Sequence, residues 1–202
     1  MIVEPKHFEY LVVQHGSVSN ERKDFSKWKA AYELSLETIY NHIAPVLPND
    51  CAALLDIGSG LGGIDVLLAN HYSDSPAVRL LDGENDPPVV RQSFEPFNNM
   101  KVAEDFLWKN GVKDFGYYTP GRLALKEGEK KFDLVVSFAA YGFHIHPGNY
   151  LEDLMKVIHK NTVVVLDVRR SKDVWLGLLV NELGSPRVLH RAEKYVRVAF
   201  RA

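Results

Sequence analysis

From residue 51 to the end of the chain, short apolar runs alternate with longer amphipathic segments, and this alternation constrains the fold more than any other feature. Short runs that are almost wholly apolar are typical of strands buried on both faces. Strands that alternate with helices predict a mostly parallel sheet covered by helices. The predicted strands are residues 52–57, 77–81, 115–118, 132–137 and 162–167, and the predicted helices are residues 62–72, 99–110, 148–160 and 172–183.

The two ends of the chain complete this prediction. Residues 187–190 and 195–201 are strand-like runs joined by a short connection, which predicts an antiparallel hairpin and a seven-stranded sheet. Near the N-terminus, apolar residues recur at three- and four-residue steps and predict a helix over residues 24–42, on the flank of the sheet or as a cap over a substrate. We therefore expect an α/β fold with a doubly wound, Rossmann-like, mostly parallel sheet in residues 51–202, preceded by a helical extension in residues 1–50.

Composition excludes several classes of partner. The 24 basic and 26 acidic residues leave a net charge of −2, so no overall basic field would attract nucleic acid, although a local basic patch stays open. We expect a small-molecule acceptor as the partner. The single cysteine, Cys51, excludes an internal disulfide and a cysteine-cluster zinc site. No apolar run approaches the roughly 20 residues that cross a bilayer, and the N-terminus lacks a signal-peptide pattern, so we expect a cytoplasmic protein with no membrane partner. The oligomeric state is left open, although residues 195–200 would pair with another chain if they formed a sheet edge.

The segment LLDIGSGLGGIDVLL, residues 54–68, joins the first predicted strand to the first predicted helix through a glycine-rich turn. In open α/β sheets the ligand lies at the carboxyl ends of the strands, where the strand order reverses. Gly58, Gly60 and Gly63 match the spacing G-x-G-x-x-G, and Asp82 follows about 20 residues later, as in nicotinamide-dinucleotide sites. The spacing by itself therefore permits a dinucleotide.

Asp56, two residues before the first glycine, favours a different ligand. Its carboxylate would repel the pyrophosphate of a dinucleotide. The amino-acid end of S-adenosylmethionine carries an ammonium beside a carboxylate, so an acid and the free N–H groups of the turn would complement both charges. The alternative is that Asp56 only caps the turn, but an acid inside an apolar run needs a partner if it is buried.

Several segments resemble known motifs. LLDIGSGLGG is similar to the first motif of class I S-adenosylmethionine-dependent methyltransferases, RLLDGE to their second, and KKFDLVVSFAAYGFHI to their fourth-strand motif and active-site loop. FNNMKVAEDFLWKNGV, and YGFHIHPGNYL followed by VVVLDVRR, resemble a little-characterised subgroup labelled as sugar O-methyltransferases. The resemblance covers the chain from residue 51 onward and implies S-adenosylmethionine as the cofactor.

The resemblance also implies a set of binding residues, with Asp82 on the ribose hydroxyls. The expected cofactor-binding residues are Asp56, Gly58, Ser59, Gly60, Gly62, Asp82, Gly83 and Ser137. The chain departs from the family pattern after the third strand, where many members carry an acid for the adenine amino group and this chain has residues 117–120, YYTP. Stacking or backbone contacts would then hold the adenine.

The loop after the fourth predicted strand carries the candidate catalytic residues. Methyl transfer is an in-line displacement that needs alignment of the nucleophile and exclusion of water, and a hydroxyl nucleophile gains from a base. Tyr141, His144 and His146 stand at this position, and His144 is the first candidate for the base. The alternatives are that His146 starts the next helix and that Tyr141 packs in the core.

A catalytic metal is not expected. His144 and His146 could ligate an ion together with Glu152, Asp153 or Asp167. However, the metal-dependent enzymes of this resemblance carry an acid after the fourth strand, where this chain has SFA at residues 137–139. Asp167 would either contact the substrate or form a local ion pair, and residues 83–98, which contain three prolines, are expected to form an ordered lid.

We therefore expect a methyltransferase that uses S-adenosylmethionine to methylate a hydroxyl of a small acceptor such as a saccharide. The motif Asp/Asn-Pro-Pro-aromatic does not follow the fourth strand, which argues against amino-methylation of DNA bases. An NAD-dependent oxidoreductase is the alternative enzyme, supported by the glycine spacing and opposed by Asp56 and by the lack of a second domain. A non-catalytic S-adenosylmethionine-binding module is the third possibility.

Overall fold

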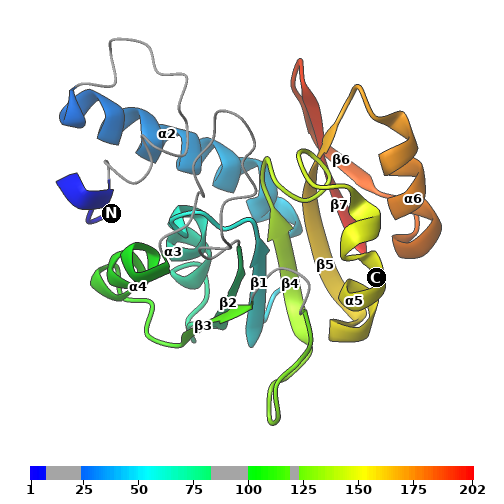
Figure 1. Cartoon of the computed structure of the whole chain (residues 1–202), viewed down its shortest axis with the longest axis horizontal. Coiled ribbons are helices and arrows are strands. Elements are labelled where there is room, and N and C mark those ends of the chain that lie inside the picture. The colour runs from blue at the N-terminus through cyan, green and yellow to red at the C-terminus, as the bar shows by residue number, and fades with distance from the viewer. Residues whose placement is uncertain (8–23, 83–99, 119–122) are drawn as a thin grey trace, which may run out of the picture.

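Seven strands form one sheet in the order β3-β2-β1-β4-β5-β7-β6 (Figure 1). The computed structural model describes residues 1–7, 24–82, 100–118 and 123–202. The strands are β1 (Ala53–Ile57), β2 (Ala77–Leu81), β3 (Phe115–Tyr118), β4 (Phe132–Ser137), β5 (Ile158–Arg169), β6 (Arg187–Arg191) and β7 (Tyr195–Arg201). The strands β1 to β5 are parallel, and β7 runs antiparallel between β5 and β6. The predicted α/β sheet with a closing hairpin is confirmed.

The point where the strand order reverses lies beside β1. The chain runs outward from β1 through β2 to β3, and then returns to pair β4 with the other side of β1. The carboxyl ends of β1 and β4 therefore flank the crevice at which open α/β sheets bind their ligands. The segments that follow β1, β2 and β4 all begin at this edge.

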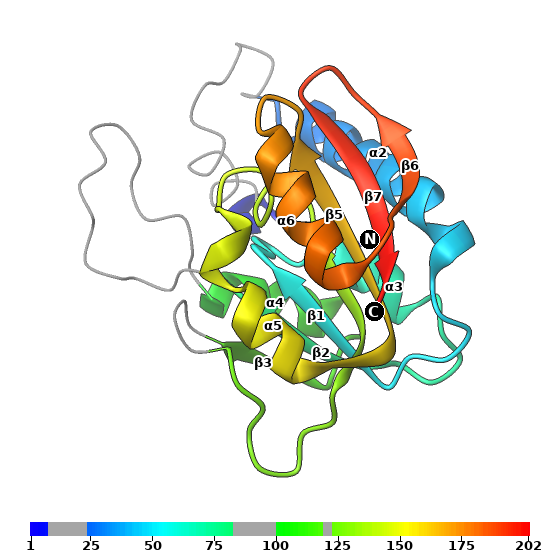
Figure 2. The same ribbon diagram turned by 90° about the vertical axis from the view of Figure 1, so that its right-hand side faces the viewer.

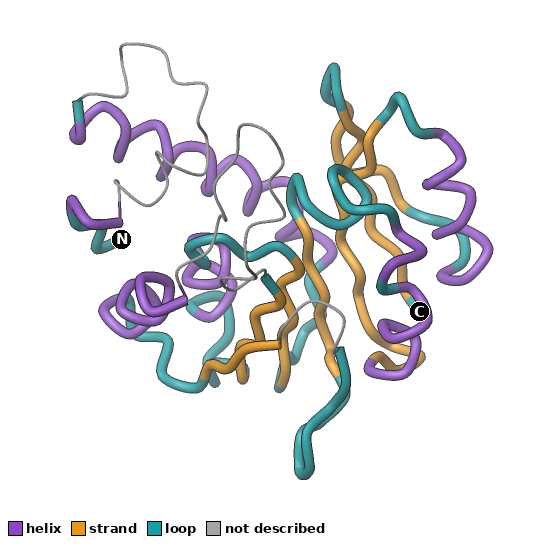
Figure 3. The backbone as a smooth tube through the Cα atoms, in the orientation of Figure 1, coloured by secondary structure: helices purple, strands orange, loops and turns teal. Residues whose placement is uncertain are grey.

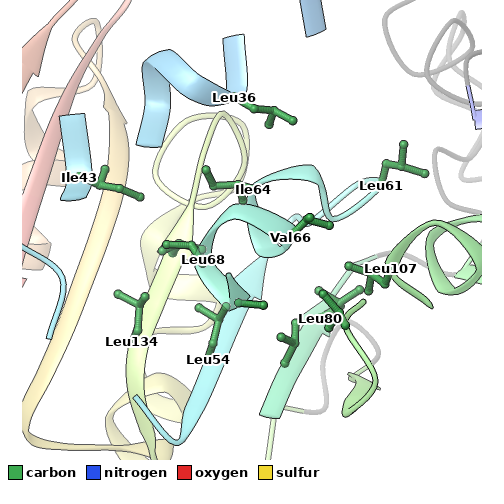
Figure 4. Packing of buried hydrophobic residues seen from close by; sticks show 14 of the residues in the cluster. Leu36, Ile43, Leu54, Leu61, Ile64, Val66, Leu68, Leu80, Leu107 and Leu134 are labelled. Atoms are coloured by element: carbon green, nitrogen blue, oxygen red, sulfur yellow. The ribbon is translucent and has the colours of Figure 1, made fainter. Parts of the chain in front are cut away.

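Helices cover both faces of the sheet (Figures 2 and 3). One face carries α2 (Phe25–Ile43), α3 (Gly63–Ala69) and α4 (Met100–Lys109), and the other carries α5 (Leu151–Val157) and α6 (Asp173–Leu183). Neighbouring strand residues face opposite clusters: Leu54 packs with α2, α3 and α4 (Figure 4), whereas Leu55 packs with α5 and α6. Because both faces of the sheet are buried, the central strands β1 and β4 are almost wholly apolar, which made them visible as short apolar runs.

The helix α2 confirms the helix predicted for residues 24–42. It begins after Asp24, whose carboxylate accepts hydrogen bonds from the N–H groups of Ser26 and Lys27, at 3.0 and 3.3 Å. Its buried residues join the cluster beneath α3 and α4, so α2 and the sheet share one core. None of the described helices combines the length and the apolar character needed to cross a membrane.

One prediction of element position is corrected. The helix expected over residues 148–160 is shorter, because a 3-10 turn, η3 (Pro147–Asn149), precedes α5, and the chain from Ile158 onward belongs to β5. Ile158 is buried and pairs with Phe132 of β4, so its backbone joins the strand ladder and the helix ends at Val157. The strand β7 lies between β5 and β6, and the edges of the described sheet are β3 and β6. The condition under which residues 195–200 would pair with another chain is therefore not met.

Candidate functional site

The turn after β1 is held against two neighbouring segments by its first glycine. The N–H of Gly58 donates to the carbonyl of Leu81 at 2.7 Å, which ties the turn to the end of β2. Gly58 has φ +78°, and a Cβ at this position would lie 2.1 Å from the Cβ of Ala140 in the loop after β4. Only glycine therefore permits this close approach of the two loops.

The third glycine of the motif serves the packing of a helix. A Cβ on Gly63 would lie 2.0 Å from the hydroxyl oxygen of Tyr32 and 2.7 Å from Cδ1 of Leu36, both on α2. Gly63 is therefore needed so that α2 can approach the start of α3. The dinucleotide-like spacing of the glycines thus has a second explanation that involves no phosphate.

Asp82 lies at the carboxyl end of β2 and contacts the glycine turn directly. Its Oδ2 accepts a hydrogen bond from the N–H of Gly60 at 2.7 Å. The side-chain oxygen of Ser59, in the same turn, is buried and has no hydrogen-bond partner among the described residues. The structure therefore brings Gly58, Ser59, Gly60 and Asp82 together, and Gly62 closes the turn by donating from its N–H to the carbonyl of Ser59 at 2.9 Å.

Two buried acids lie at this turn. Asp56 in β1 is 2% exposed, and Asp65 in the first turn of α3 is fully buried. Oδ1 of Asp56 and both carboxylate oxygens of Asp65 lack a hydrogen-bond donor among the described residues. Burial, followed by the negative charges of Asp65 and Asp82, raises the pKa of Asp56, and burial also raises the pKa of Asp65.

Sequence reasoning singled out Asp56 and missed Asp65. The signal was present, because Asp65 interrupts the apolar run GIDVLLA in the same way as Asp56 interrupts ALLDI. An acid in a helix of this composition can also lie on an exposed face, and only the packing of α3 on the sheet shows that it does not. Asp65 therefore joins the candidate cofactor-binding residues.

The side chains of Ser137 and Tyr141 form hydrogen bonds that hold the loop after β4 in place. The hydroxyl of Ser137 donates to the carbonyl of Ile57 at 2.6 Å and accepts from the N–H of Tyr141 at 2.9 Å. The ring of Tyr141 is fully buried, and its hydroxyl donates to the carbonyl of Pro147 at 2.8 Å. Burial raises the pKa of Tyr141, which disfavours its use as a base. Both side chains thus stabilise the loop, as the core-packing alternative for Tyr141 supposed.

The two histidines of this loop occupy different environments. His144 is exposed, and its ring meets that of Phe143 edge to face at 4.7 Å between centroids. His146 is also exposed, but its Nδ1 accepts from the N–H of Gly148 at 3.0 Å, so it caps η3. Its ring contacts that of Trp175 at 5.2 Å between centroids. His146 therefore starts the next helical segment, as the alternative interpretation stated.

Asp167, at the carboxyl edge of β5, forms a buried ion pair. Its two oxygens accept from Nε and Nη2 of Arg197 on β7, at 2.8 and 2.9 Å. The guanidinium carbon of Arg197 lies 4.8 Å from the ring centroid of Phe138, the residue that follows β4. Arg197 was missed, although a charge within the apolar run YVRVAFR was a visible signal.

Several predicted features are not gathered at this site or cannot be placed. Glu152 and Asp153, considered as metal ligands, bind Lys156 on the same helix. Two of the predicted features lie outside the described residues. One is the expected lid of residues 83–98, which includes Gly83. The other is residues 119–120, part of the segment after β3 that departs from the family pattern. The site is therefore built from the ends of β1, β2 and β4 and the start of α3.

Two other polar clusters are occupied by the protein itself. Glu4, His7 and Asp105 lie close enough together to hold an ion, but Lys109 and Lys6 pair with these carboxylates. A hollow of about 400 Å³ lies at the amino ends of the strands, on the edge opposite the glycine turn. Its Asp133 already accepts from the N–H groups of Ala52 and Ala53, at 2.8 and 3.1 Å.

Comparison with protein-family models and with curated proteins yields no match. Solved structures do match. An O-methyltransferase from Bacillus cereus in complex with SAH aligns with a TM-score of 0.59 at 18% identity, over 100% of this chain and 93% of that one. A SAM-dependent methyltransferase from Aquifex aeolicus aligns with a TM-score of 0.58 at 15% identity, over 98% of this chain and all of that one.

A third structure, the ribosomal protein L11 methylase from Lactobacillus delbrueckii subsp. bulgaricus, aligns with a TM-score of 0.52 at 18% identity, over 83% of this chain and 77% of that one. At these identities the likeness concerns the fold, and the printed activities belong to the other proteins. The L11 methylase and the O-methyltransferase also show that one fold serves different acceptors. This chain has the Rossmann-like α/β fold of S-adenosylmethionine-dependent methyltransferases.

Proposed function

We propose that the protein is an S-adenosylmethionine-dependent methyltransferase that methylates a hydroxyl oxygen of a small acceptor, such as a saccharide. The observation that carries this proposal is the convergence of Asp56, Asp65 and Asp82 on one glycine turn at the strand-order reversal. An acidic turn whose buried carboxyl oxygens are partly unpaired suits a ligand that carries an ammonium and a sulfonium. It opposes a pyrophosphate, so the dinucleotide alternative is disfavoured.

Different residues of the turn would bind different parts of the cofactor. Asp56 and Asp65 face the ammonium, Ser59 offers a hydroxyl, and Asp82 at the end of β2 faces the ribose hydroxyls while it holds Gly60. When bound, S-adenosylmethionine supplies an electrophilic methyl group on a sulfonium. The chain's remaining task is to align the acceptor and exclude water.

In the proposed reaction, His144 would take the proton of the acceptor hydroxyl as a general base. Bound S-adenosylmethionine would supply the methyl group and would leave as S-adenosylhomocysteine, so charge and atoms balance. His144 suits this role because it is exposed on a loop that Ser137 and Tyr141 hold in place. The sugar assignment rests on the resemblance of the loop and β5 segments stated above.

The test is calorimetric titration of the full chain with S-adenosylhomocysteine and, separately, with reduced nicotinamide dinucleotide. We expect saturable binding of S-adenosylhomocysteine alone. Asp82→Ala should weaken it about tenfold or more, because a hydrogen bond to a charged group contributes roughly 1.5–3 kcal/mol. Asp74→Ala, at an exposed acid in the connection before β2, is the matched control and should bind like the parent.

Binding of the dinucleotide alone would move the search to hydride transfer. If S-adenosylhomocysteine binds, a labelled methyl donor and a panel of hydroxylated acceptors test the reaction itself. Tight cofactor binding together with no transfer to any acceptor would favour the non-catalytic module.

A further inference from the structure

Asp56 and Asp65 are buried carboxyls on different elements, and Oδ1 of Asp56 and both oxygens of Asp65 have no hydrogen-bond partner among the described residues. One lies in β1 and the other in the first turn of α3, and both are at least 98% buried. Oδ2 of Asp65 lies 3.3 Å from the position that a Cβ on Gly62 would take, so this carboxyl lies against the backbone of the glycine turn. Among the described residues, no donor reaches its oxygens.

Among the residues that the structure describes, the surroundings of this pair supply no positive charge. The charged groups that act on Asp56 are Asp65 and Asp82, which are both acidic. The neighbouring elements bring Tyr32 from α2, Leu107 from α4 and Ala140 from the loop after β4 to the turn, and none of these is a cation. Burial and the repulsion between the two carboxylates raise the pKa of Asp56, which favours a pair that shares one proton.

We infer that Asp65 and Asp56 together form the ammonium-recognition site of the cofactor pocket, and that the pair releases its shared proton when the ammonium enters. The inference rests on the proposed function and adds to it a proton that the pair shares and releases. The ligand class is a primary ammonium next to a carboxylate, as in the methionine part of the cofactor. The proton passes to solvent and the ammonium replaces it, so the net charge of the occupied site is unchanged.

Release of a proton on binding predicts how the affinity for S-adenosylhomocysteine changes with pH. Only the pair without its proton can hold the ammonium as two carboxylates, so affinity for S-adenosylhomocysteine rises with pH until the free pair has lost its proton. Release of one proton corresponds to an increase in affinity of at most about tenfold per pH unit. If the pair served only to stabilise the fold, it would keep its proton in the complex. The affinity of the protein for S-adenosylhomocysteine would then not rise with pH in this way.

The experiment is calorimetric titration of the full chain with S-adenosylhomocysteine at pH 6, in two buffers with different enthalpies of ionisation. The difference in observed enthalpy counts the protons released, and we expect close to one. Asp65→Asn keeps the shape of the side chain and removes the second charge, so it should release none. At high pH, Asp65→Asn should bind S-adenosylhomocysteine about tenfold more weakly than the parent. The difference in affinity between the two proteins should become smaller as pH falls.

Two controls isolate the ammonium. 5′-Methylthioadenosine has the nucleoside and no amino-acid end, so it should bind the parent protein without releasing a proton. In the infrared spectrum of the free parent, a carboxylic-acid carbonyl band should be present, should disappear with S-adenosylhomocysteine, and should be missing in Asp65→Asn.

Binding of S-adenosylhomocysteine without proton release, or equal release by Asp65→Asn, would overturn this inference and leave the proposed function standing. Absence of any binding by the parent would overturn both. These outcomes separate the two proposals.

Discussion

Arg197 and Asp167 face each other across neighbouring strands and form a double hydrogen bond in the core. They are register partners in the β5–β7 ladder, and the side chains are 2% and 4% exposed. The remaining guanidinium nitrogen, Nη1, lies 3.2 Å from Nδ1 of His42 in the last turn of α2. One buried ion pair thus connects the hairpin, β5 and the N-terminal helix at the carboxyl edge of the sheet.

Removing one member of this pair should be costly. Arg197→Met leaves the Asp167 carboxylate buried without a partner, and we expect the free energy of unfolding to fall by about 3–5 kcal/mol. The double variant Arg197→Met, Asp167→Leu should recover much of this loss, because no buried charge remains. Urea unfolding of the two single variants and the double variant measures the effect, and additive losses would show that the pair does not act as a unit.

Stability should fall at mildly acidic pH because of His42. Burial, the neighbouring His190 and Arg197 together lower the pKa of His42 from its ordinary value of 6.5. The folded state therefore binds fewer protons than the unfolded chain between the lowered pKa and 6.5, so the free energy of unfolding decreases as pH falls through this window.

His42→Leu should remove this part of the pH dependence. The comparison is the difference in unfolding free energy between the parent and His42→Leu from pH 7.5 to 5.5, measured by urea titration. The pKa of His7 is also lowered by burial, but His7 is present in both proteins and cancels in the difference. Curves that stay parallel across this range would contradict the assignment.

A methyl group at Gly63 should be tolerated poorly. Gly63→Ala places a Cβ against Tyr32 and Leu36 of α2, and overpacking of this kind costs roughly 1–3 kcal/mol. Gly177→Ala is the matched control, because it lies within α6 and a Cβ there has nothing within 4 Å. It should raise stability by about 0.5–1 kcal/mol through helix propensity.

A second substitution should relieve part of the clash in Gly63→Ala. Tyr32→Phe removes the hydroxyl oxygen that is nearest to the added methyl group, so it should rescue part of the loss in the Gly63→Ala background. Thermal unfolding of the four proteins tests this. No rescue would mean that Leu36, the next contact on α2, sets the cost.

Substitutions in the loop after β4 should distinguish a catalytic residue, His144, from a structural one, Tyr141. His144→Ala should slow methyl transfer by about 10²–10⁴-fold, the range for loss of a general base, and leave S-adenosylhomocysteine affinity nearly unchanged. Tyr141→Phe should instead lower the unfolding free energy by about 1 kcal/mol, because the carbonyl of Pro147 loses its donor. Single-turnover rates with a labelled methyl donor, set beside thermal unfolding, distinguish the two effects. Equal slowing by both variants would remove His144 from its proposed role.

The sequence by itself determined most strand positions, the glycine turn and the sheet edge at which the candidate residues meet. Strands buried on both faces are contiguous apolar runs, so β2, β3 and β4 could be read with their observed bounds. Gly58, Gly60 and Asp82 were predictable because a turn after β1 and an acid after the neighbouring β2 must meet at one sheet edge. These features depend on short stretches of chain and on the general geometry of parallel sheets.

The tertiary structure decided which side chains face one another. Asp65 lies against Asp56 only because α3 packs back onto β1, and Asp167 meets Arg197, 30 residues away, only through the β5–β7 register. Tyr141 and His144 stand in one loop, yet the first is fully buried and the second exposed, since the turns around Ala139 and Gly142 orient them. The start of β5 at Ile158 likewise depends on pairing with Phe132. Local sequence patterns do not encode such contacts, because each one is selected by the packing of elements that are distant along the chain.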